Sequence, residues 1–148
     1  MTRNATGRCM CGQVRFTASD VPDTCGACHC EMCRRWTGSA LLGVNIPRDR
    51  IVWEGAEHIA ELQSSSWAKR GWCRECGSGL YFQVTVDGEW SKDLEVPIGL
   101  FDDPNGFEFS NEIYVDHKPD SYAYEGSKGR KLLTRADCVA KFAILDNE

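Results

Sequence analysis

The stretch Cys73-Arg74-Glu75-Cys76-Gly77, taken together with Cys9-Met10-Cys11-Gly12, decides the fold of this chain. Each stretch ends in Cys-Gly, and glycine tolerates a positive φ, so the backbone can curl around a metal ion and direct N–H groups at the sulfurs. Two cysteine pairs far apart in sequence can complete one tetrahedral Cys₄ zinc site, which contributes on the order of 10 kcal/mol to folding. Such a closed, structural site would tie the N-terminal strand to the middle of the chain. Buried free thiols and a redox Cys-x-x-Cys pair are the alternatives.

A second group of cysteines lies in the stretch Thr24-Cys25-Gly26-Ala27-Cys28-His29-Cys30-Glu31-Met32-Cys33. The spacing of Cys28, Cys30 and Cys33 lets one loop and the start of a helical turn present three sulfurs to one ion. Three protein thiolates leave the fourth position of Zn²⁺ open to water or substrate, as in catalytic zinc sites. Two other interpretations stay open: Cys25 is the fourth ligand of a second structural site, or Cys25 and Cys28 form a disulfide switch.

An open zinc site of this kind suits thiol substrates. A free thiol with a pKa of about 8.5 is only ~3% ionised at pH 7, whereas coordination deprotonates it. The thiolate can then add to an electrophilic carbon, and the reverse reaction returns the leaving thiolate of a C–S bond to the same place. Arg34 and Arg35 follow the last sulfur, and they are candidates for binding the carboxylates of an anionic thiol; a solvated surface is the alternative. We expect His29 to support or pack beside the site rather than ligate, and Trp36 to lie in the core.

Length, charge and cysteine usage restrict the class of protein. A chain of 148 residues fits one domain, which we place at residues 1–148. The net charge of −5 argues against sequence-independent nucleic-acid binding, and no apolar run reaches the ~18 residues of a membrane span. Residues 1–7 are polar and lack the apolar region of a signal peptide, so we predict a cytoplasmic protein. Nine cysteines, an odd number, in a reducing compartment favour metal binding over disulfides.

The pattern along the chain predicts a mainly β protein with a short C-terminal helix. Alternating or β-branched and aromatic runs predict strands at residues 13–16, 41–46, 51–53, 80–86, 96–101 and 112–115. A short helix is expected from about Cys30 to Trp36, ending near Gly38. The C-terminal helix would begin after Thr134 as N-cap, with Asp137 in a variant of the capping box, and would place Val139, Phe142 and Ala143 on one face.

The order of the cysteine motifs along the chain is similar to that of a known protein family. The chain reads Cys9-x-Cys11-Gly12-x-Val14, then Cys28-His29-Cys30-x-x-Cys33-Arg34-Arg35-x-x-Gly38-Ser39, then Arg70-Gly71-x-Cys73-x-x-Cys76-Gly77-Ser78-x-Leu80. Over roughly residues 7–119 this resembles the glutathione-dependent formaldehyde-activating enzyme family, which includes the relatives of centromere protein V. After the late Pro119, where family members often carry Trp, this chain has Asp120-Ser121-Tyr122.

The resemblance implies a β-tent fold of small antiparallel sheets around zinc, with two Zn²⁺ per chain. It implies that the structural ion is held by Cys9, Cys11, Cys73 and Cys76, and that the second ion, where the substrate thiol approaches, is held by Cys28, Cys30 and Cys33. The implied activity is that of a carbon–sulfur lyase similar to S-(hydroxymethyl)glutathione synthase, which adds glutathione to formaldehyde or reverses that addition. The expected partner is therefore a small-molecule thiol such as glutathione, with no nucleic acid and no membrane.

Two other functions remain compatible with the motifs. One is a non-catalytic zinc module for protein interaction, and the other is a redox sensor that uses the thiols from Cys25 to Cys33. No motif identifies the residue that would act as a general acid in an enzyme. Glu31, His29 and His117 are candidates for that role only.

Overall fold

A small antiparallel sheet is formed near the N-terminus. The computed structural model describes residues 2–126 and 128–142 of the chain. The sheet has the strand order β1-β2-β5, with bounds β1 (Thr2–Arg8), β2 (Arg15–Pro22) and β5 (Ile51–Glu54). In β2, buried Phe16 and Ala18 alternate with exposed neighbours. This alternation of period two gives the sheet one face that packs on a core.

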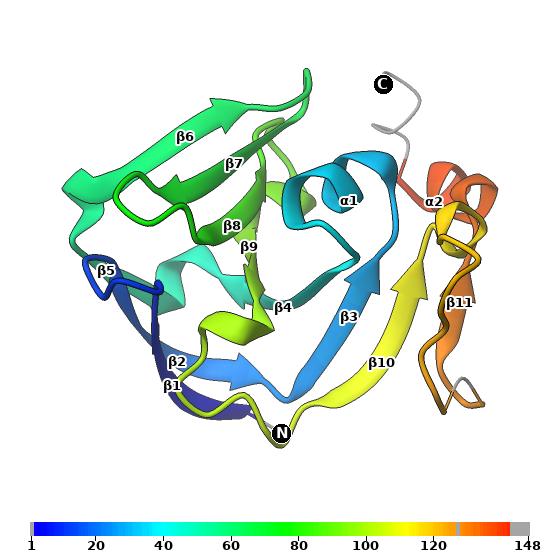
Figure 1. Cartoon of the computed structure of the whole chain (residues 1–148), viewed down its shortest axis with the longest axis horizontal. Helices are drawn as coiled ribbons and strands as arrows, with labels where there is room; N and C mark the ends of the chain where they lie inside the picture. The colour runs from blue at the N-terminus through cyan, green and yellow to red at the C-terminus, as the bar shows by residue number, and fades with distance from the viewer. Residues whose placement is uncertain (1, 127, 143–148) are drawn as a thin grey trace.

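Eight further strands form one mixed sheet in the order β11-β10-β3-β4-β9-β8-β7-β6. Strand β10 pairs in parallel with both β3 and β11, whereas the other neighbours are antiparallel. The sheet curls, so that β6–β8 and β10–β11 lie at its two ends with β4 and β9 between them (Figure 1). The bounds are β3 (Thr24–Cys28), β4 (Leu41–Pro47), β6 (Ile59–Gln63), β7 (Ala68–Cys73), β8 (Gly79–Val84), β9 (Asp93–Pro97), β10 (Glu108–Ile113) and β11 (Lys131–Leu133).

Two α-helices have well-defined ends. Helix α1 (Glu31–Thr37) has Cys30 as N-cap, whose sulfur accepts a hydrogen bond from the Cys33 N–H, and it ends at Gly38 with φ 87°. Helix α2 (Arg135–Lys141) begins with a capping box between Thr134 and Asp137. Short 3₁₀ turns occur at Arg48–Arg50, Ala56–His58, Glu89–Lys92, Ile98–Leu100 and Val115–His117.

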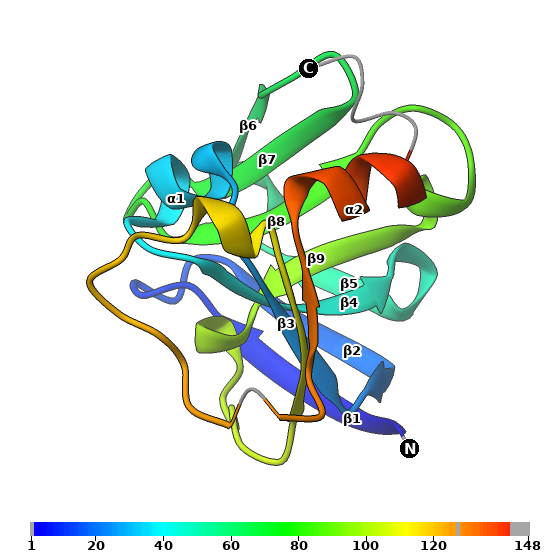
Figure 2. The same ribbon diagram turned by 90° about the vertical axis from the view of Figure 1, so that its right-hand side faces the viewer.

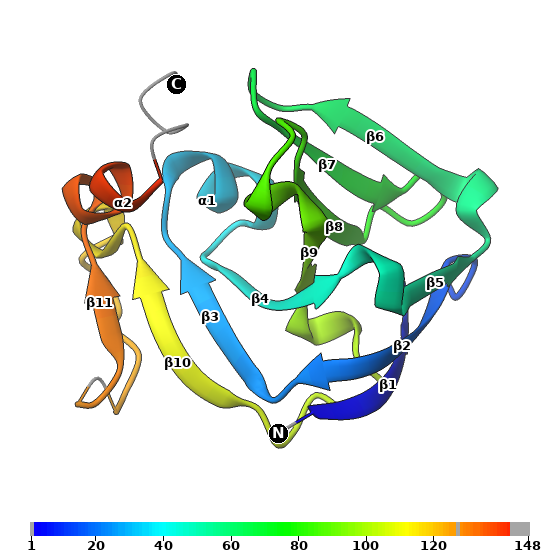
Figure 3. The same ribbon diagram turned by 180° about the vertical axis from the view of Figure 1, so that it is seen from behind.

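The two faces of the large sheet have different roles. The face opposite the helices packs on the small sheet, where Phe16 and Val21 of β2 meet Val44 of β4 and Val96 of β9 in the main core. Figures 2 and 3 show α1 and α2 on one side of β4 and β9, and β1 and β2 on the other. A second apolar cluster around Trp67, Tyr114 and Cys138 secures α2 to the face that carries the helices. The same face carries a cavity that is lined by residues of both helices.

Most of the predicted elements are confirmed. The mainly β class and the short C-terminal helix are observed, and α1 ends at Gly38 as expected. Val139 and Phe142 pack on the second apolar cluster, while Ala143 lies outside the described residues. No helix within residues 2–126 and 128–142 has the length and apolarity needed to cross a membrane.

Several element ends differ from the prediction for physical reasons. Residues 13 and 14 precede β2, because the Val14 N–H and C=O close the loop around Cys9 instead of a strand ladder. Residues 98–100 form a 3₁₀ turn after Pro97 rather than the second half of a strand. Strand β3 lies inside the cysteine-rich stretch and was not predicted, because cysteine, glycine and alanine do not show the alternation of polar and apolar residues that is typical of a strand.

Candidate functional site

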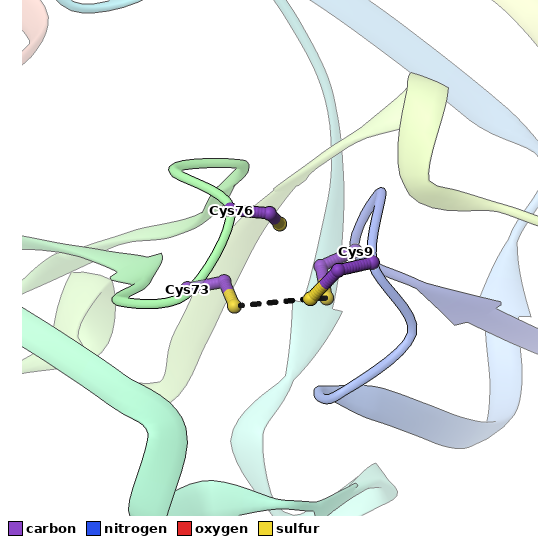
Figure 4. Close-up of side chains that lie close together, drawn as sticks. Cys9, Cys73 and Cys76 are labelled. Carbon is purple, nitrogen blue, oxygen red and sulfur yellow. Dashed lines mark hydrogen bonds between the residues drawn. The ribbon is translucent and has the colours of Figure 1, made fainter.

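The first cysteine cluster joins two loops from different sheets. Cys9 and Cys11 lie in the loop between β1 and β2, Cys73 ends β7, and Cys76 lies in the turn before β8. The four sulfurs all lie within 4.8 Å of one another. Figure 4 shows the sulfurs of Cys73 and Cys76 on the side of their turn that faces the Cys9 loop. The structure therefore brings these four side chains together at the place where a link between the N-terminal strands and the middle of the chain is expected.

The distances between these sulfurs fit a shared metal ion. Cys9 and Cys11 are 3.6 Å apart, and Cys11 and Cys73 are 3.8 Å apart, measured between Sγ atoms. Neither distance is that of a disulfide, which is about 2.05 Å. A tetrahedron with Zn–S bonds of about 2.3 Å has edges of roughly 3.8 Å. The all-thiolate donor set and its spacing thus suit Zn²⁺.

The two glycines that follow the cysteine pairs adopt the conformation expected of them. Gly12 and Gly77 both have φ 81°, in the left-handed region. The Gly77 N–H donates to the Cys73 carbonyl at 2.8 Å and closes the turn. Desolvation raises the pKa of Cys76, but hydrogen bonds with Ser78 and Cys11 together outweigh it and bring this pKa down to about 5. A low thiol pKa at this position favours the thiolate that a metal requires.

The second cluster forms where β3 passes into α1. Cys28 is the last residue of β3, Cys30 is the N-cap of α1 and Cys33 lies one turn into the helix. Their sulfurs all lie within 4.8 Å of one another. Hydrogen bonds from Cys28 and Cys33 lower the pKa of Cys30 to about 2. The structure therefore brings together the three residues predicted for the second ion.

These three cysteines line a cavity of about 310 Å³ on the helix-bearing face of the large sheet. Its wall is largely apolar and includes Trp67, Phe82 and Trp90. Among the described residues, no fourth His, Cys, Asp or Glu joins the cluster. Cys25 belongs to neither cluster; it packs in the main core, and burial is the largest cause of its raised pKa. The arrangement is three sulfurs beside an open space that can hold a ligand.

A buried arginine adjoins the second cluster. Arg70, in β7, donates from Nη1 and Nη2 to Cys33 Sγ at 3.7 and 3.6 Å. Its guanidinium carbon lies 5.0 Å from the ring centre of Trp36 and 4.9 Å from that of Phe82. The two rings fix the orientation of the guanidinium. Its positive charge offsets the negative charge of the thiolates. The sequence prediction assigned Arg70 no role at the site, although the Arg70-Gly71 pair stands in the third motif.

His29 lies between two cysteines of the cluster but turns away from them. It is buried, and its Nε2 is 2.8 Å from Glu112 Oε1, while Arg130 Nε donates to Glu112 Oε2 at 3.0 Å. This buried network connects the β3–α1 junction with β10 and with the segment before β11. The expectation that His29 supports the site instead of ligating agrees with this placement.

The other predicted contacts lie away from the cavity. Neither Arg34 nor Arg35 lines it, and Arg35 Nε pairs instead with Glu31 Oε1 at 3.0 Å on the exposed surface of α1. Trp36 is half-buried and stacks with Arg70 rather than lying in the main core. His117 is exposed beside Tyr114. The cationic group nearest the three sulfurs is therefore Arg70, so the predicted carboxylate contacts of Arg34 and Arg35 have no support from geometry.

Sequence reasoning also missed polar groups on the cavity floor. Gly26 of β3 and Gly43 of β4 are paired across the sheet. A Cβ atom at Gly26 would overlap Asn111 Oδ1, and one at Gly43 would overlap Glu95 Oε1. The two glycines thus make room for an amide and a carboxyl beneath the cavity. Gly43, inside the apolar run of residues 41–46, was the available signal.

The fold and the two preformed sulfur clusters define a class of mainly β proteins suited to binding metal through thiolates, with one cluster open to a cavity. The family model of the glutathione-dependent formaldehyde-activating enzyme matches residues 4–117, and the chain belongs to this family. An uncharacterized lyase of Schizosaccharomyces pombe is 30% identical over 118 residues, which cover 80% of this chain and 83% of that protein. The crystal structure of a Rhodobacter sphaeroides protein has a TM-score of 0.55 at 19% identity, covering 87% of this chain and 99% of that one. This last likeness concerns the fold alone.

Proposed function

We propose that this protein is a zinc-dependent carbon–sulfur lyase-type enzyme of the cytoplasm, which joins a thiol such as glutathione to a small aldehyde such as formaldehyde, or reverses that step. Cys9, Cys11, Cys73 and Cys76 hold a structural Zn²⁺ in this proposal. Cys28, Cys30 and Cys33 hold a second Zn²⁺ and supply the catalytic centre. Family membership and the lyase among the relatives support a lyase-type activity; the particular thiol and aldehyde are our proposal.

The observation that carries the proposal is the second cluster on its cavity. Three sulfurs converge at the wall of the cavity, and no fourth protein donor in the described chain completes their coordination. When bound there, Zn²⁺ provides a place where an external thiol loses its proton and is held. A closed structural site would need a fourth ligand from the chain, as the first cluster has.

The residues around the cluster have distinct tasks in this reaction. Arg70 donates to Cys33, and its positive charge would offset part of the negative charge of three protein thiolates and a substrate thiolate held beside them. Trp67 and Phe82 line the apolar wall and exclude water from the reacting atoms. The addition forms one C–S bond, and the carbonyl oxygen takes up a proton equivalent to the one released by the thiol. The reverse reaction breaks that C–S bond and returns the proton.

Metal analysis with two matched variants tests the proposal. We expect about two zinc ions per chain, of which a chelator removes one while the fold persists. Cys28→Ser should remove that labile zinc and abolish formation of S-(hydroxymethyl)glutathione, followed by NMR with ¹³C-formaldehyde. Cys25→Ser is the control and should change neither, because Cys25 lies outside both clusters.

Two results would contradict the proposal. If Cys25→Ser removed the second zinc, that site would be closed by four protein ligands. If glutathione and formaldehyde reacted at the uncatalysed rate with the protein carrying both zinc ions, the protein would be a zinc module without this chemistry.

A further inference from the structure

The floor of the cavity carries a carboxyl group without a partner. Glu95 projects from β9 into the cavity, over Gly43 of the neighbouring strand. In the described part of the chain, no hydrogen bond or ion pair reaches this carboxyl. Glu95 is half-buried, and a carboxyl at the wall of a largely apolar cavity without a donor or a cation beside it is costly to ionise, so its retention requires a reason.

The groups beside Glu95 are also acceptors. Asn111 Oδ1 lies over Gly26 and accepts a hydrogen bond from Ser110 Oγ at 3.2 Å, which leaves it a second lone pair. Asp93, two residues before Glu95 on the same strand, lines the cavity as well and adds a second negative charge. A carboxylate, an amide oxygen and a nearby second carboxylate together recognise a hydrogen-bond donor that carries positive charge.

The geometry of the sheet sets how far this floor is from the sulfur cluster. Gly26 and Cys28 are two residues apart on β3, so they face the same side of the sheet, roughly 7 Å apart along the strand. Gly43, under Glu95, is paired directly with Gly26. A ligand whose sulfur lies at the cysteine cluster would therefore reach the floor only with a group several bonds away from that sulfur.

The geometry points to Glu95 and Asn111 as a binding subsite for the ammonium group of a thiol substrate, in which a spacer separates the ammonium from the sulfur. This inference rests on the proposed function, because it assumes that the thiol is bound at Cys28, Cys30 and Cys33. Glutathione has the required form, since its ammonium is at the far end of the γ-glutamyl group. Cysteine, whose ammonium is close to its sulfur, cannot span the distance.

The protonation of Glu95 is consistent with a role in binding a cation. Burial, and after it the charge of Asp93, raise the pKa of Glu95 to about 7. Besides Asp93, the charged or titratable residues that line the cavity outside the cysteine cluster are Arg70, Lys141, Tyr114 and Cys25, the last of which packs its side chain in the main core. Neither cation forms an ion pair with Glu95 in the described chain. An ammonium beside the carboxylate would lower this pKa again, so binding below pH 7 releases a proton.

Binding measurements on the zinc-loaded protein test the subsite. Calorimetric titration compares glutathione with N-acetylglutathione, which has the same thiol and carboxylates but no ammonium. We expect glutathione to bind about tenfold to a hundredfold more tightly, the range for a hydrogen bond between charged groups. Glu95→Gln should remove this preference, whereas Glu54→Gln, which changes an exposed carboxyl of β5, should leave it intact. Because both thiols are protonated between pH 6 and pH 7.5, the ratio of their affinities should rise with pH as Glu95 ionises.

A second measurement needs no variant. The Glu95 carboxyl, followed by ¹³C NMR in the wild-type protein, should titrate near pH 7 without ligand and at least one pH unit lower when glutathione is saturating; N-acetylglutathione should not lower it. Equal binding of the two thiols would refute the ammonium subsite while leaving the proposed function intact. If neither thiol bound, the proposed function would fail and the subsite with it.

Discussion

Because the carboxyl of Glu95 has no hydrogen-bond or ion-pair partner in the described chain, we predict that the free energy of unfolding depends on pH even without a substrate. Its pKa is about 7 in the folded protein against a usual value of 4.5, chiefly because of burial. The folded state thus holds the proton more tightly than the unfolded state, so the free energy of unfolding should fall as the pH rises from about 4.5 through 7. A pKa difference of about 2.5 corresponds to about 3 kcal/mol, and because Glu95 is only half-buried we expect about 1–3 kcal/mol.

Glu95→Gln removes the charge while keeping the size of the side chain. At pH 8 we expect the zinc-loaded variant to be more stable than the wild type by about 1–3 kcal/mol, which is roughly 3–10 °C in Tm for a chain of this length. At pH 5 the wild-type carboxyl is protonated, so the two proteins should melt together. Differential scanning calorimetry at both pH values measures the difference, with Glu54→Gln as the exposed control. If Glu95→Gln were less stable than the wild type at pH 8, the carboxylate would have a stabilising partner and the reasoning would be wrong.

Three further substitutions test the surroundings of the site. Arg70→Met removes both donors to Cys33, so the affinity of the second cluster for zinc, measured by chelator competition, should fall about tenfold or more; an unchanged affinity would mean that Arg70 only packs. Glu112→Gln leaves Arg130 buried without its carboxylate, and urea unfolding should show a loss of about 3 kcal/mol. If the free energy of unfolding hardly changed, the charge of Glu112 would not be what stabilises the network of His29, Glu112 and Arg130. Thr134→Ala breaks the cap of α2 and should cost about 1 kcal/mol in the same assay without changing the zinc content.

The local structure was predictable wherever a residue acts on its own backbone. Thr134 with Asp137 caps α2, Gly38 ends α1, and Gly12 and Gly77 take a positive φ after the cysteine pairs. Each of these follows from side-chain hydrogen bonding or from the missing Cβ, and none of them depends on distant parts of the chain. Strand β3 was missed, because its cysteines, glycine and alanine lack the β-branched pattern of a strand and it is stabilised by its neighbours in the sheet.

The grouping of the site residues was only partly predictable. Cys28, Cys30 and Cys33 are close together in the sequence, so their spacing was sufficient to predict that their sulfurs lie near one another. Arg70 reaches Cys33 from β7, and Glu95 reaches the cavity floor from β9, through strand pairings that no local pattern reveals. The prediction chose Arg34 and Arg35 because they follow the cluster in sequence, but on a helix the adjacent residues project in other directions.

The sequence by itself predicted which cysteines would group together, while it left open whether Cys25 joins the second group. The spacing within each pair or triad and the glycine turns are properties of short segments, whereas the meeting of the Cys9–Cys11 pair with the Cys73–Cys76 pair depends on the tertiary structure. Tertiary structure decided what surrounds the sulfurs, since the curled eight-stranded sheet brings Arg70, Glu95 and Asn111 from three separate strands to one cavity. The physical reason is that side-chain direction in a strand is fixed by its pairing register, which only the folded sheet defines.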